Sequence, residues 1–361
     1  MSNTNSRIFL SPPFVGAAER AAVARAFDSG YVAPCGPQVD EFERRLAKLA
    51  GRKYAVAVSS GTAAIDLLMA ELGVDETWTV VAPTLTFIAT VGPAFHRGAK
   101  LVFVDSDATG NIDVSLLEKA LGSHRAKKAL VVGVDLYGNC CDYGAIAKLC
   151  RKFGAVFVTD AAEAVGATRD GRPAGSAGLA GVYSFNGNKI VTTSGGGAIV
   201  TDDRGLAERA RKRAQQSREK CVWYEHKEVG YNYRLSNILA ALGLAQLGRL
   251  PAILRKREAN FKWYAKNWKG DLLAPTLGAN HWLTVALLAS RRERDRLLRR
   301  FAAADIEARP VWKPLHLQPV FAKCRVFGGE VAEALFERGV CLPSGTGLKS
   351  GDFARIARCL K

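Results

Sequence analysis

Short apolar runs recur along the first two-thirds of the chain, and amphipathic stretches separate several of them. Seven runs have the length of buried strands: 54–58, 79–82, 101–104, 129–134, 156–160, 181–185 and 197–201. Helical spacing of apolar residues fills three of the intervals, at 63–72, 114–121 and 142–153. Repeated strand–helix–strand units predict an α/β protein whose mostly parallel seven-stranded sheet is covered by helices on both faces.

The pattern becomes mainly helical after residue 201. Residues 203–216 and 236–268 have helical periodicity, and we expect Pro251 to break or kink the second stretch. Short mixed segments follow residue 270 and end in a helix at 353–360, which is typical of a smaller α+β domain. We therefore predict an N-terminal segment at 1–28, a large domain at 29–255 and a small C-terminal domain at 256–361.

Composition excludes several classes of protein. Of the 361 residues, 48% are hydrophobic, which excludes wholesale disorder. No apolar run reaches the roughly 18 to 20 residues that span a bilayer, and residues 1–14 lack a signal-peptide pattern. Eight cysteines occur without a CxxC pair, which favours reduced thiols over a disulfide framework or a metal site. We expect a cytoplasmic protein without a membrane partner.

The chain carries a formal net charge of +17, which by itself suggests nucleic acid as a partner. The densest basic runs, at 204–218 and 291–300, contain apolar residues at helical spacing and therefore favour the solvated faces of amphipathic helices. No zinc-finger, RRM or KH motif occurs. The positive charge also suits a substrate that carries several phosphates. We expect no nucleic-acid partner, and a basic nucleic-acid-binding or regulatory protein stays an alternative of another class.

Candidate chemistry follows the strands, because ligands of open parallel sheets bind beyond the carboxyl ends of the strands. Gly61, Thr62 and Ala63 open the helix after the first strand, where free N–H groups can hold a phosphate. The plain alternative is an N-cap at Ser60 or Thr62. Phe87, after the second strand, either lies flat on a planar heterocycle or belongs to the core.

Two carboxylates and a lysine complete this series. Asp160 directly follows the fifth apolar run, and Glu163 comes three residues later. They are either partly buried acids that face a cation or the two members of a helix capping box. Ser184 ends the sixth strand, and Lys189 follows in a segment rich in Gly, Asn and Ser, although an isolated lysine is usually a surface residue.

One cofactor uses all of these groups in this order. Pyridoxal 5'-phosphate needs a lysine for its aldehyde, a carboxylate that keeps its pyridine nitrogen protonated, a stacking surface and a phosphate cup. The sequence therefore favours pyridoxal 5'-phosphate as the cofactor.

The chain also resembles the DegT/StrS-type sugar aminotransferases, which are pyridoxal phosphate enzymes of fold type I, like aspartate aminotransferase. The resemblance covers almost the whole chain. It is carried by SSGTAAIDLLM (59–69), PTLTFIAT (83–90), FVDSD (103–107), LYGN (136–139), TDAAEAVG (159–166), SFNGNKIVTTSGGGAIVTDD (184–203) and GYNYRLSNILAALGLAQL (230–247). Thr159 departs from the family pattern, which usually has an acidic residue there, and the region of Trp78 lacks the usual Gly-rich turn.

The resemblance implies roles for individual residues. Lys189 and Asp160 are the catalytic pair, with Lys189 bound to the cofactor aldehyde and Asp160 paired with the pyridine nitrogen. Glu163 is implied to approach the ring hydroxyl. Phe87 would stack on the ring, and the phosphate would be held by Gly61, Thr62, Ala63 and Ser184. Asn232 would reach the phosphate of the neighbouring subunit, which implies a homodimer with shared active sites.

Four stretches carry a narrower resemblance, at 30–43, 185–197, 223–234 and 309–321. They are similar to enzymes that aminate C4 of a UDP-linked 4-keto-6-deoxy-N-acetylhexosamine for bacterial surface glycans, with glutamate as the amino donor. By this resemblance the nucleotide-sugar would lie near Tyr31, Pro34, Lys313 and His316, although His316 could equally be a satisfied surface histidine.

Two enzymatic alternatives stay open. One is an aminotransferase acting at C3 of another nucleotide sugar, linked to dTDP or GDP. The other is a pyridoxal phosphate-dependent dehydratase on the same fold. The best-known dehydratases have histidine in place of the lysine, so Lys189 argues against the second alternative.

Overall fold

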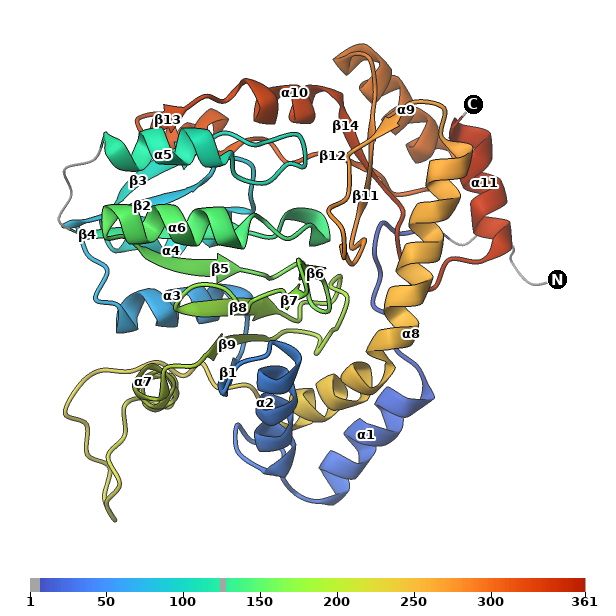
Figure 1. Cartoon of the computed structure of the whole chain (residues 1–361). Coiled ribbons are helices and arrows are strands. Elements are labelled where there is room, and N and C mark those ends of the chain that lie inside the picture. Colours follow the sequence, from blue (N-terminus) through green and yellow to red (C-terminus); the bar gives the residue numbers. More distant parts are fainter. Residues whose placement is uncertain (1–6, 124–127, 361) are drawn as a thin grey trace.

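The computed structural model describes residues 7–123 and 128–360, and a large sheet forms its centre (Figure 1). Within the described residues this sheet has eight strands. In spatial order they are β1 (Tyr54–Val58), β9 (Gly197–Thr201), β8 (Ala180–Ser184), β5 (Val156–Asp160), β4 (Lys128–Val134), β2 (Trp78–Pro83), β3 (Lys100–Val104) and β13 (Arg325–Phe327). β9 is antiparallel to both of its neighbours, and the other pairings are parallel. All seven predicted strands are present, and the mostly parallel sheet is confirmed.

The expected number of strands was one too small. The eighth strand, β13, pairs with β3 through three residues only. It comes from the C-terminal part of the chain, and its Arg–Val–Phe sequence is too short and too mixed to predict a strand. Only the free edge of β3 makes this segment a strand.

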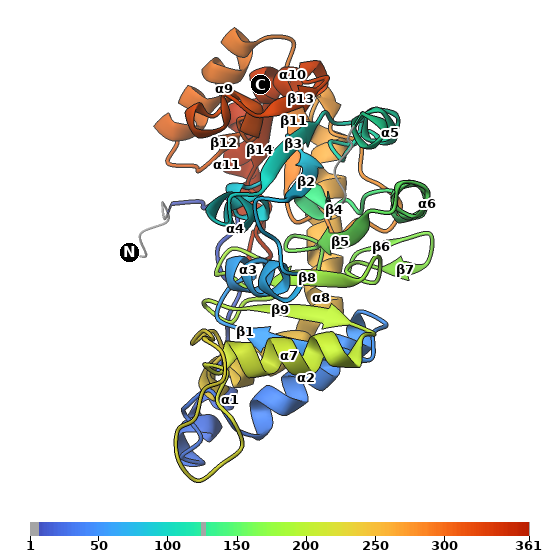
Figure 2. The same cartoon turned by 90° about the vertical axis from the view of Figure 1, so that its left-hand side faces the viewer.

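Helices cover both faces of the large sheet, as Figure 2 shows. One face packs against α2 (Pro37–Leu49), α5 (Val114–Gly122) and α6 (Tyr143–Phe153), and the other against α3 (Gly61–Glu71), α4 (Gly92–His96) and α7 (Arg204–Ala214). Alternate residues of β1 divide between these layers, with Ala55 and Ala57 in one core and Val56 and Val58 in the other. The period of two along a doubly covered strand explains this division.

Helix α8 (Asn237–Asn267) packs against α1 (Ala17–Asp28) and α2 and continues toward the C-terminal part. Pro251 does not break α8, and Figure 1 shows the helix changing direction along its length. Of the two expected effects of Pro251, a break or a kink, the structure shows the kink. By length and composition α8 is also apolar enough to cross a membrane. That departs from the expectation that no segment would qualify, and it is weak evidence, because core helices pass the same test.

The C-terminal part holds a second, antiparallel sheet. Its strands are β10 (Asp271–Leu272), β11 (Thr284–Leu287), β14 (Gly339–Leu342) and β12 (Arg309–Pro310), in that spatial order. The nearby helices are α9 (Arg291–Ala303), α10 (Glu330–Arg338) and α11 (Ser350–Leu360). The basic run at 291–300 is indeed an amphipathic helix, with Leu297 and Phe301 buried. The division at residues 255 and 256 stays a prediction, and it falls inside α8.

The remaining elements are short. A hairpin joins β6 (Thr168–Arg169) to β7 (Arg172–Pro173), and 3-10 turns lie at Ile88–Thr90, Leu136–Gly138, Leu315–Leu317 and Pro319–Phe321. The turn at Leu136–Gly138 follows β4, and the turn at Ile88–Thr90 follows β2. Both lie at the carboxyl edge of the large sheet, where the sequence places the candidate site.

Candidate active site

A cavity of about 730 Å³ opens at the carboxyl edge of the large sheet. Seven of the predicted cofactor residues line it: Gly61, Thr62, Phe87, Asp160, Glu163, Ser184 and Lys189. The opposite wall comes from distant parts of the chain, namely residues 9–13, Trp282, Glu307, Arg309 and Trp312. The cavity therefore lies between the sheet edge, the N-terminal segment and the C-terminal part.

The start of α3 forms one end of the cavity. Ser60 caps this helix, since its hydroxyl accepts a hydrogen bond from the backbone N–H of Ala63 at 3.0 Å. A Cβ atom added at Gly61 would lie 2.9 Å from the Cβ of Ser184, so only glycine fits this close approach. The first N–H groups of a helix have no partner one turn back and carry the positive end of its dipole. The N-cap and the phosphate cradle that the sequence suggested are thus compatible, with Ala63 buried behind the lining residues.

Asp160, at the end of β5, is held by hydrogen bonds and is almost fully buried. Its carboxylate accepts hydrogen bonds from the Thr90 hydroxyl at 2.7 Å and from the N–H of Ala162 at 3.1 Å. The Thr90 hydroxyl in turn contacts that of Thr86 at 2.8 Å. Burial raises the pKa of Asp160, and these donors oppose the rise. No helix follows Asp160, so the capping-box alternative for Asp160 and Glu163 is wrong.

Glu163 and Lys189 form a buried ion pair inside the cavity. The Lys189 Nζ lies 3.4 Å from the Glu163 Oε1, and the N–H of Tyr137 donates to the Glu163 Oε2 at 2.7 Å. The Nζ also lies 4.0 Å from the centre of the Trp282 ring, within cation–π range. Burial raises the pKa of Glu163 to about 7, against the opposing effect of the Lys189 charge.

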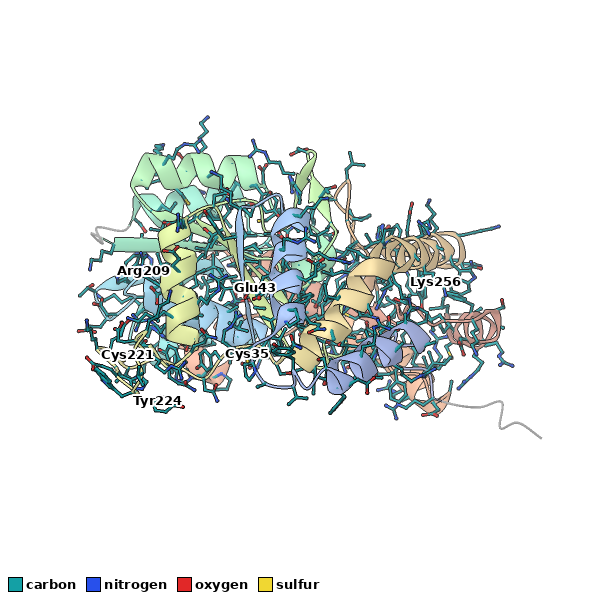
Figure 3. The ribbon with its side chains drawn as sticks, turned by 90° about the horizontal axis from the view of Figure 1, so that it is seen from below. Cys35, Glu43, Arg209, Cys221, Tyr224 and Lys256 are labelled. Carbon is teal, nitrogen blue, oxygen red and sulfur yellow. The ribbon has the colours of Figure 1, made fainter. Side chains whose placement is uncertain are left out.

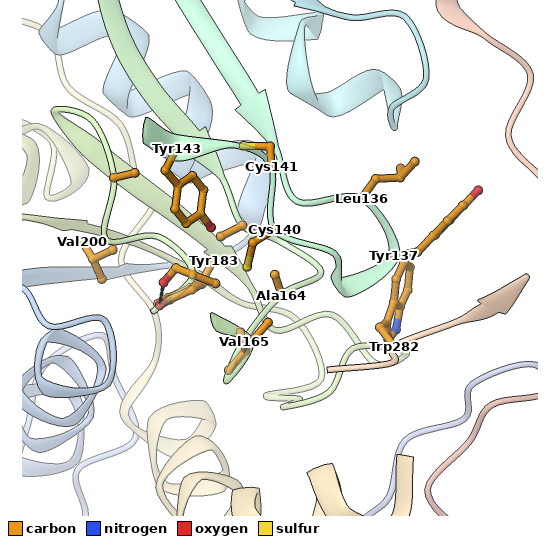
Figure 4. Packing of buried hydrophobic residues seen from close by; sticks show 14 of the residues in the cluster. Leu136, Tyr137, Cys140, Cys141, Tyr143, Ala164, Val165, Tyr183, Val200 and Trp282 are labelled. Carbon is orange, nitrogen blue, oxygen red and sulfur yellow. Dashed lines mark hydrogen bonds between the residues drawn. The ribbon is translucent and has the colours of Figure 1, made fainter. Parts of the chain in front are cut away.

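Aromatic side chains form the wall beside this pair. Phe87 is 56% exposed, which contradicts the alternative that it belongs to the core. Its ring lies 5.7 Å from that of Trp312, which in turn lies 5.1 Å from the ring of Tyr137. Figure 4 shows Tyr137 beside Trp282, and their ring centres are 6.2 Å apart. An exposed aromatic face at the edge of a cavity is suited to stacking on a planar ring.

Sequence reasoning missed several residues of this site. Thr90 fixes Asp160, and Trp282 covers the Lys189 amine. From the N-terminal segment, the Ser11 hydroxyl donates to the backbone carbonyl of Asn188 at 2.8 Å. Only Thr90 lies within a motif that the sequence singled out, PTLTFIAT. Trp282 and Ser11 are more than 90 residues from Lys189, so no local pattern marks them.

Asn232 does not line this cavity. It is exposed and forms an isolated bridge with Gln215 at the base of an arm that spans residues 217–230. This arm carries exposed apolar side chains, among them Trp223 and Tyr224. Figure 3 places Tyr224 and Cys221 of the arm at the opposite end of the molecule from Lys256 of α8. A role of Asn232 at a second subunit's site stays a prediction.

The four predicted substrate residues also lie away from the cavity lining of this chain. Tyr31, Pro34 and Lys313 are exposed. The His316 ring is partly buried and has a partner on each nitrogen: Nδ1 lies 2.6 Å from the Thr84 hydroxyl, and Nε2 lies 3.0 Å from the Glu333 carboxylate. These contacts match the alternative of a satisfied histidine, and the substrate role of the four residues stays a prediction.

The chemistry of the cavity fits pyridoxal 5'-phosphate. It offers an amine on Lys189, a buried carboxylate on Asp160, an exposed aromatic ring on Phe87, and a tight cradle of Gly61 and Ser184 at a helix start. Each group matches one part of the cofactor: aldehyde, pyridine nitrogen, ring face and phosphate. Among the described residues, no group of three or more His, Cys, Asp or Glu side chains could hold a metal ion.

Two of the named relatives are similar to this chain over nearly its full length, and a third over about two thirds of it. The chain is 42% identical to EpsN of Bacillus subtilis, which is named for a pyridoxal phosphate-dependent aminotransferase activity, over 99% of this chain and 95% of EpsN. It is 35% identical to the GDP-perosamine synthase of Caulobacter vibrioides, over 98% of this chain and 97% of the relative. A UDP-4-amino-4,6-dideoxy-N-acetyl-beta-L-altrosamine transaminase of Campylobacter jejuni is also 35% identical, over 65% of this chain and 62% of that protein.

A solved structure and a family model agree with these relatives. The crystal structure of DesI in the presence of its TDP-sugar product has a TM-score of 0.88 and is 30% identical, with 99% of this chain and 92% of DesI covered. The model of the DegT/DnrJ/EryC1/StrS aminotransferase family matches residues 13–361. The chain therefore belongs to this family of pyridoxal phosphate-dependent enzymes, as its cavity and its sequence both indicate.

Proposed function

We propose that this enzyme transfers an amino group from glutamate to C4 of a UDP-linked 4-keto-6-deoxy-N-acetylhexosamine, giving a UDP-4-amino sugar for surface glycan synthesis in the cytoplasm. The observation that carries the aminotransferase chemistry is the cavity itself, where the Lys189 amine meets the Glu163 carboxylate at 3.4 Å and the buried Asp160 lines the same space. The narrower resemblance at 30–43 and 309–321 supports the sugar and the position of amination.

The residues of the cavity divide the work. When bound, pyridoxal 5'-phosphate supplies an electron sink for the carbon that gains or loses the amine. Lys189 would hold the cofactor aldehyde and, once the amine of the amino donor has displaced it, would move a proton at the reacting carbon. Asp160 would keep a negative charge beside the ring nitrogen, and Thr90 fixes the orientation of that carboxylate. Gly61 and the start of α3 would bind the phosphate.

The remaining lining residues orient the ring and limit the access of water. Phe87 offers an exposed aromatic face on which the cofactor ring could stack. Trp282 closes the space over the Lys189 amine, and residues 9–13 cover the cavity from the N-terminal side. Limiting the access of bulk water strengthens the pairing of charges in the cavity.

A nucleotide-sugar substrate agrees with the named relatives and with the charge of the chain. Two of the three relatives and the solved structure are named for GDP-, UDP- and TDP-linked sugars, so a nucleotide sugar is common to these three proteins. The net charge of +17 suits a substrate with a pyrophosphate. We propose UDP because of the narrower sequence resemblance, while the near-full-length match to GDP-perosamine synthase makes GDP the first competitor.

We further propose that the enzyme works as a homodimer with shared active sites. In that arrangement Asn232 contacts the cofactor phosphate of the second subunit, and Tyr31, Pro34, Lys313 and His316 lie by the nucleotide-sugar. Support comes from the position of Asn232 beside the projecting arm at 217–230, whose Trp223 and Tyr224 side chains are 65% and 79% exposed in the single chain. An aromatic surface of this kind is typical of an interface.

One experiment tests the proposed reaction. The purified enzyme is incubated with glutamate and a panel of UDP-, GDP- and dTDP-linked 4-keto and 3-keto sugars, and amino-sugar products are measured by mass spectrometry. We expect the UDP-linked 4-keto-6-deoxy-N-acetylhexosamine to be consumed fastest and Lys189→Ala to abolish turnover. Faster consumption of a 3-keto or GDP-linked sugar would replace this assignment, and loss of the sugar hydroxyl without amination would indicate the dehydratase.

A further inference from the structure

One buried asparagine connects three separate segments of the active site, two through its side chain and one through its backbone. Asn280 precedes β11 in the C-terminal part of the chain and is 3% exposed. Its Nδ2 donates to the backbone carbonyls of Glu163 at 2.9 Å and Val165 at 3.1 Å. Its Oδ1 accepts from the N–H of Trp282 at 2.9 Å, and its own N–H donates to the carbonyl of Gly138 at 3.2 Å. The side-chain amide thus uses both of its donors and its acceptor.

Each of these segments carries a group that acts on the lysine or on its partner. The segment at 161–167 carries Glu163, whose carboxylate contacts the Lys189 amine. The segment at 280–282 carries Trp282, whose ring lies over the same amine. The turn at 136–138 carries Tyr137, whose N–H donates to Glu163. Asn280 itself does not line the cavity.

The backbone around Asn280 is held in uncommon conformations. Tyr137 and His281 have φ values of 55° and 53°, in the left-handed region that side chains other than glycine rarely adopt. A Cβ atom on Gly138 would lie 1.9 Å from the Asn280 Oδ1, so glycine is required there. Such strain persists only where surrounding contacts hold it, and it often accompanies functional sites.

We infer that Asn280 is a positioning residue that holds the Glu163 carboxylate and the Trp282 ring against the Lys189 amine. The loop at 161–167 has no helix or strand to fix it, and the Asn280 amide takes the place of such an element by binding two of its carbonyls. The inference rests on the role of Lys189 in holding the cofactor. It does not depend on which sugar is the substrate.

The chain offers a matched control. Asn260, on α8, is 6% exposed, and its Nδ2 also donates to two backbone carbonyls, those of Ser344 at 3.2 Å and Gly345 at 2.9 Å. Asn260→Ser and Asn280→Ser therefore remove the same kind of contact, and only the second removes it from the segments around Lys189. Any general loss of stability is common to both variants.

The first test uses the cofactor-free protein. Hydrogen–deuterium exchange is measured by mass spectrometry for peptides that cover 136–142 and 161–167. We expect Asn280→Ser to raise exchange in the 161–167 peptide by about tenfold, because the side-chain bonds to the carbonyls of Glu163 and Val165 are lost, and to raise it less in the 136–142 peptide, whose contact with the backbone N–H of residue 280 remains. We expect Asn260→Ser to leave both peptides within about twofold of wild type. Equal exchange in the two variants would overturn the inference.

The second test measures the cofactor itself without any sugar. We expect Asn280→Ser to weaken binding of pyridoxal 5'-phosphate by about tenfold and to reduce the circular dichroism of its visible band, with Asn260→Ser close to wild type. In a Glu163→Gln background the effect of Asn280→Ser should shrink, because both changes disturb the same contact. Full additivity would refute a role through Glu163. If Asn280→Ser does not fold, Asn280→Gln and Asn260→Gln, which keep an amide but displace it by one methylene, support the same comparison.

Discussion

Replacing Glu163 by glutamine tests the electrostatics of the site most simply. Glutamine keeps the shape of the side chain and can still accept the hydrogen bond that the Tyr137 N–H donates at 2.7 Å. It cannot ionise. The titratable groups that face Glu163 are Lys189, Asp160, Tyr137 and Cys341, and the substitution leaves them all in place.

The size of the effect follows from the pKa of Glu163. Burial raises this pKa from 4.5 to about 7, and one pKa unit corresponds to about 1.4 kcal/mol. A carboxyl whose pKa is raised by folding stabilises the protein fully below its unfolded pKa. That contribution falls as the pH rises and is lost above the folded pKa. Wild type should therefore lose about 3 kcal/mol relative to Glu163→Gln between pH 4.5 and 7.5.

The assay is urea unfolding of the cofactor-free proteins at half-unit steps of pH, followed by far-UV circular dichroism. Groups that do not face Glu163 titrate alike in both proteins and cancel in the difference between the two free energies of unfolding. We expect the two proteins to agree near pH 4.5 and Glu163→Gln to be the more stable one at pH 7.5. Parallel stability curves across this range would refute a raised pKa for Glu163. If wild type instead became more stable relative to the variant with rising pH, folding would lower this pKa.

Two further changes test other parts of the site, and a third tests a buried acid outside the cavity lining. Thr90→Val removes the hydroxyl that donates to Asp160 at 2.7 Å, so it should raise the pKa of Asp160 further and weaken cofactor binding about tenfold in a fluorescence titration, whereas Thr90→Ser should restore it. Gly61→Ala places a Cβ atom 2.9 Å from that of Ser184 and should lower cofactor affinity at least about tenfold in the same titration, with unchanged affinity contradicting the cradle. Asp135 is fully buried, and burial raises its pKa to about 7, so wild type should lose about 3 kcal/mol of stability relative to Asp135→Asn between pH 4 and 7 in urea unfolding. An unchanged pH slope would count against this.

Much of the fold could be predicted because the large sheet is buried on both faces. Runs such as 129–134 and 156–158 are apolar throughout, since each face of their strands packs against helices. The candidate residues on the sheet side of the cavity could be predicted for a related reason. Parallel strands bring their carboxyl ends to one edge, so residues such as Asp160 and Ser184 were expected near one another.

The far wall of the cavity could not be predicted in this way. Trp282 reaches the Lys189 amine, and Ser11 reaches Asn188, only through the packing of the N-terminal and C-terminal segments against the sheet. Neither segment shows a periodic pattern at those positions. The same holds for β13, which becomes a strand because β3 offers a free edge.

Sequence spacing alone could not decide between the alternative roles of Asp160, Glu163 and Phe87, because each role depends on residues distant in the sequence. Asp160 and Glu163 have the spacing of a capping box, yet the loop after β5 turns away and Asn280 binds its carbonyls. Phe87 has an apolar side chain of the kind usually found in a core, yet it lies at the cavity beside Trp312.

The central claim is that the Lys189 amine binds pyridoxal 5'-phosphate in this cavity. Borohydride reduction of the protein with bound cofactor, followed by proteolysis and mass spectrometry of the peptides, tests it directly. We predict that the pyridoxyl label is found on Lys189 and disappears in Lys189→Ala. Label on another lysine, or none in a protein that has bound the cofactor, would contradict the account.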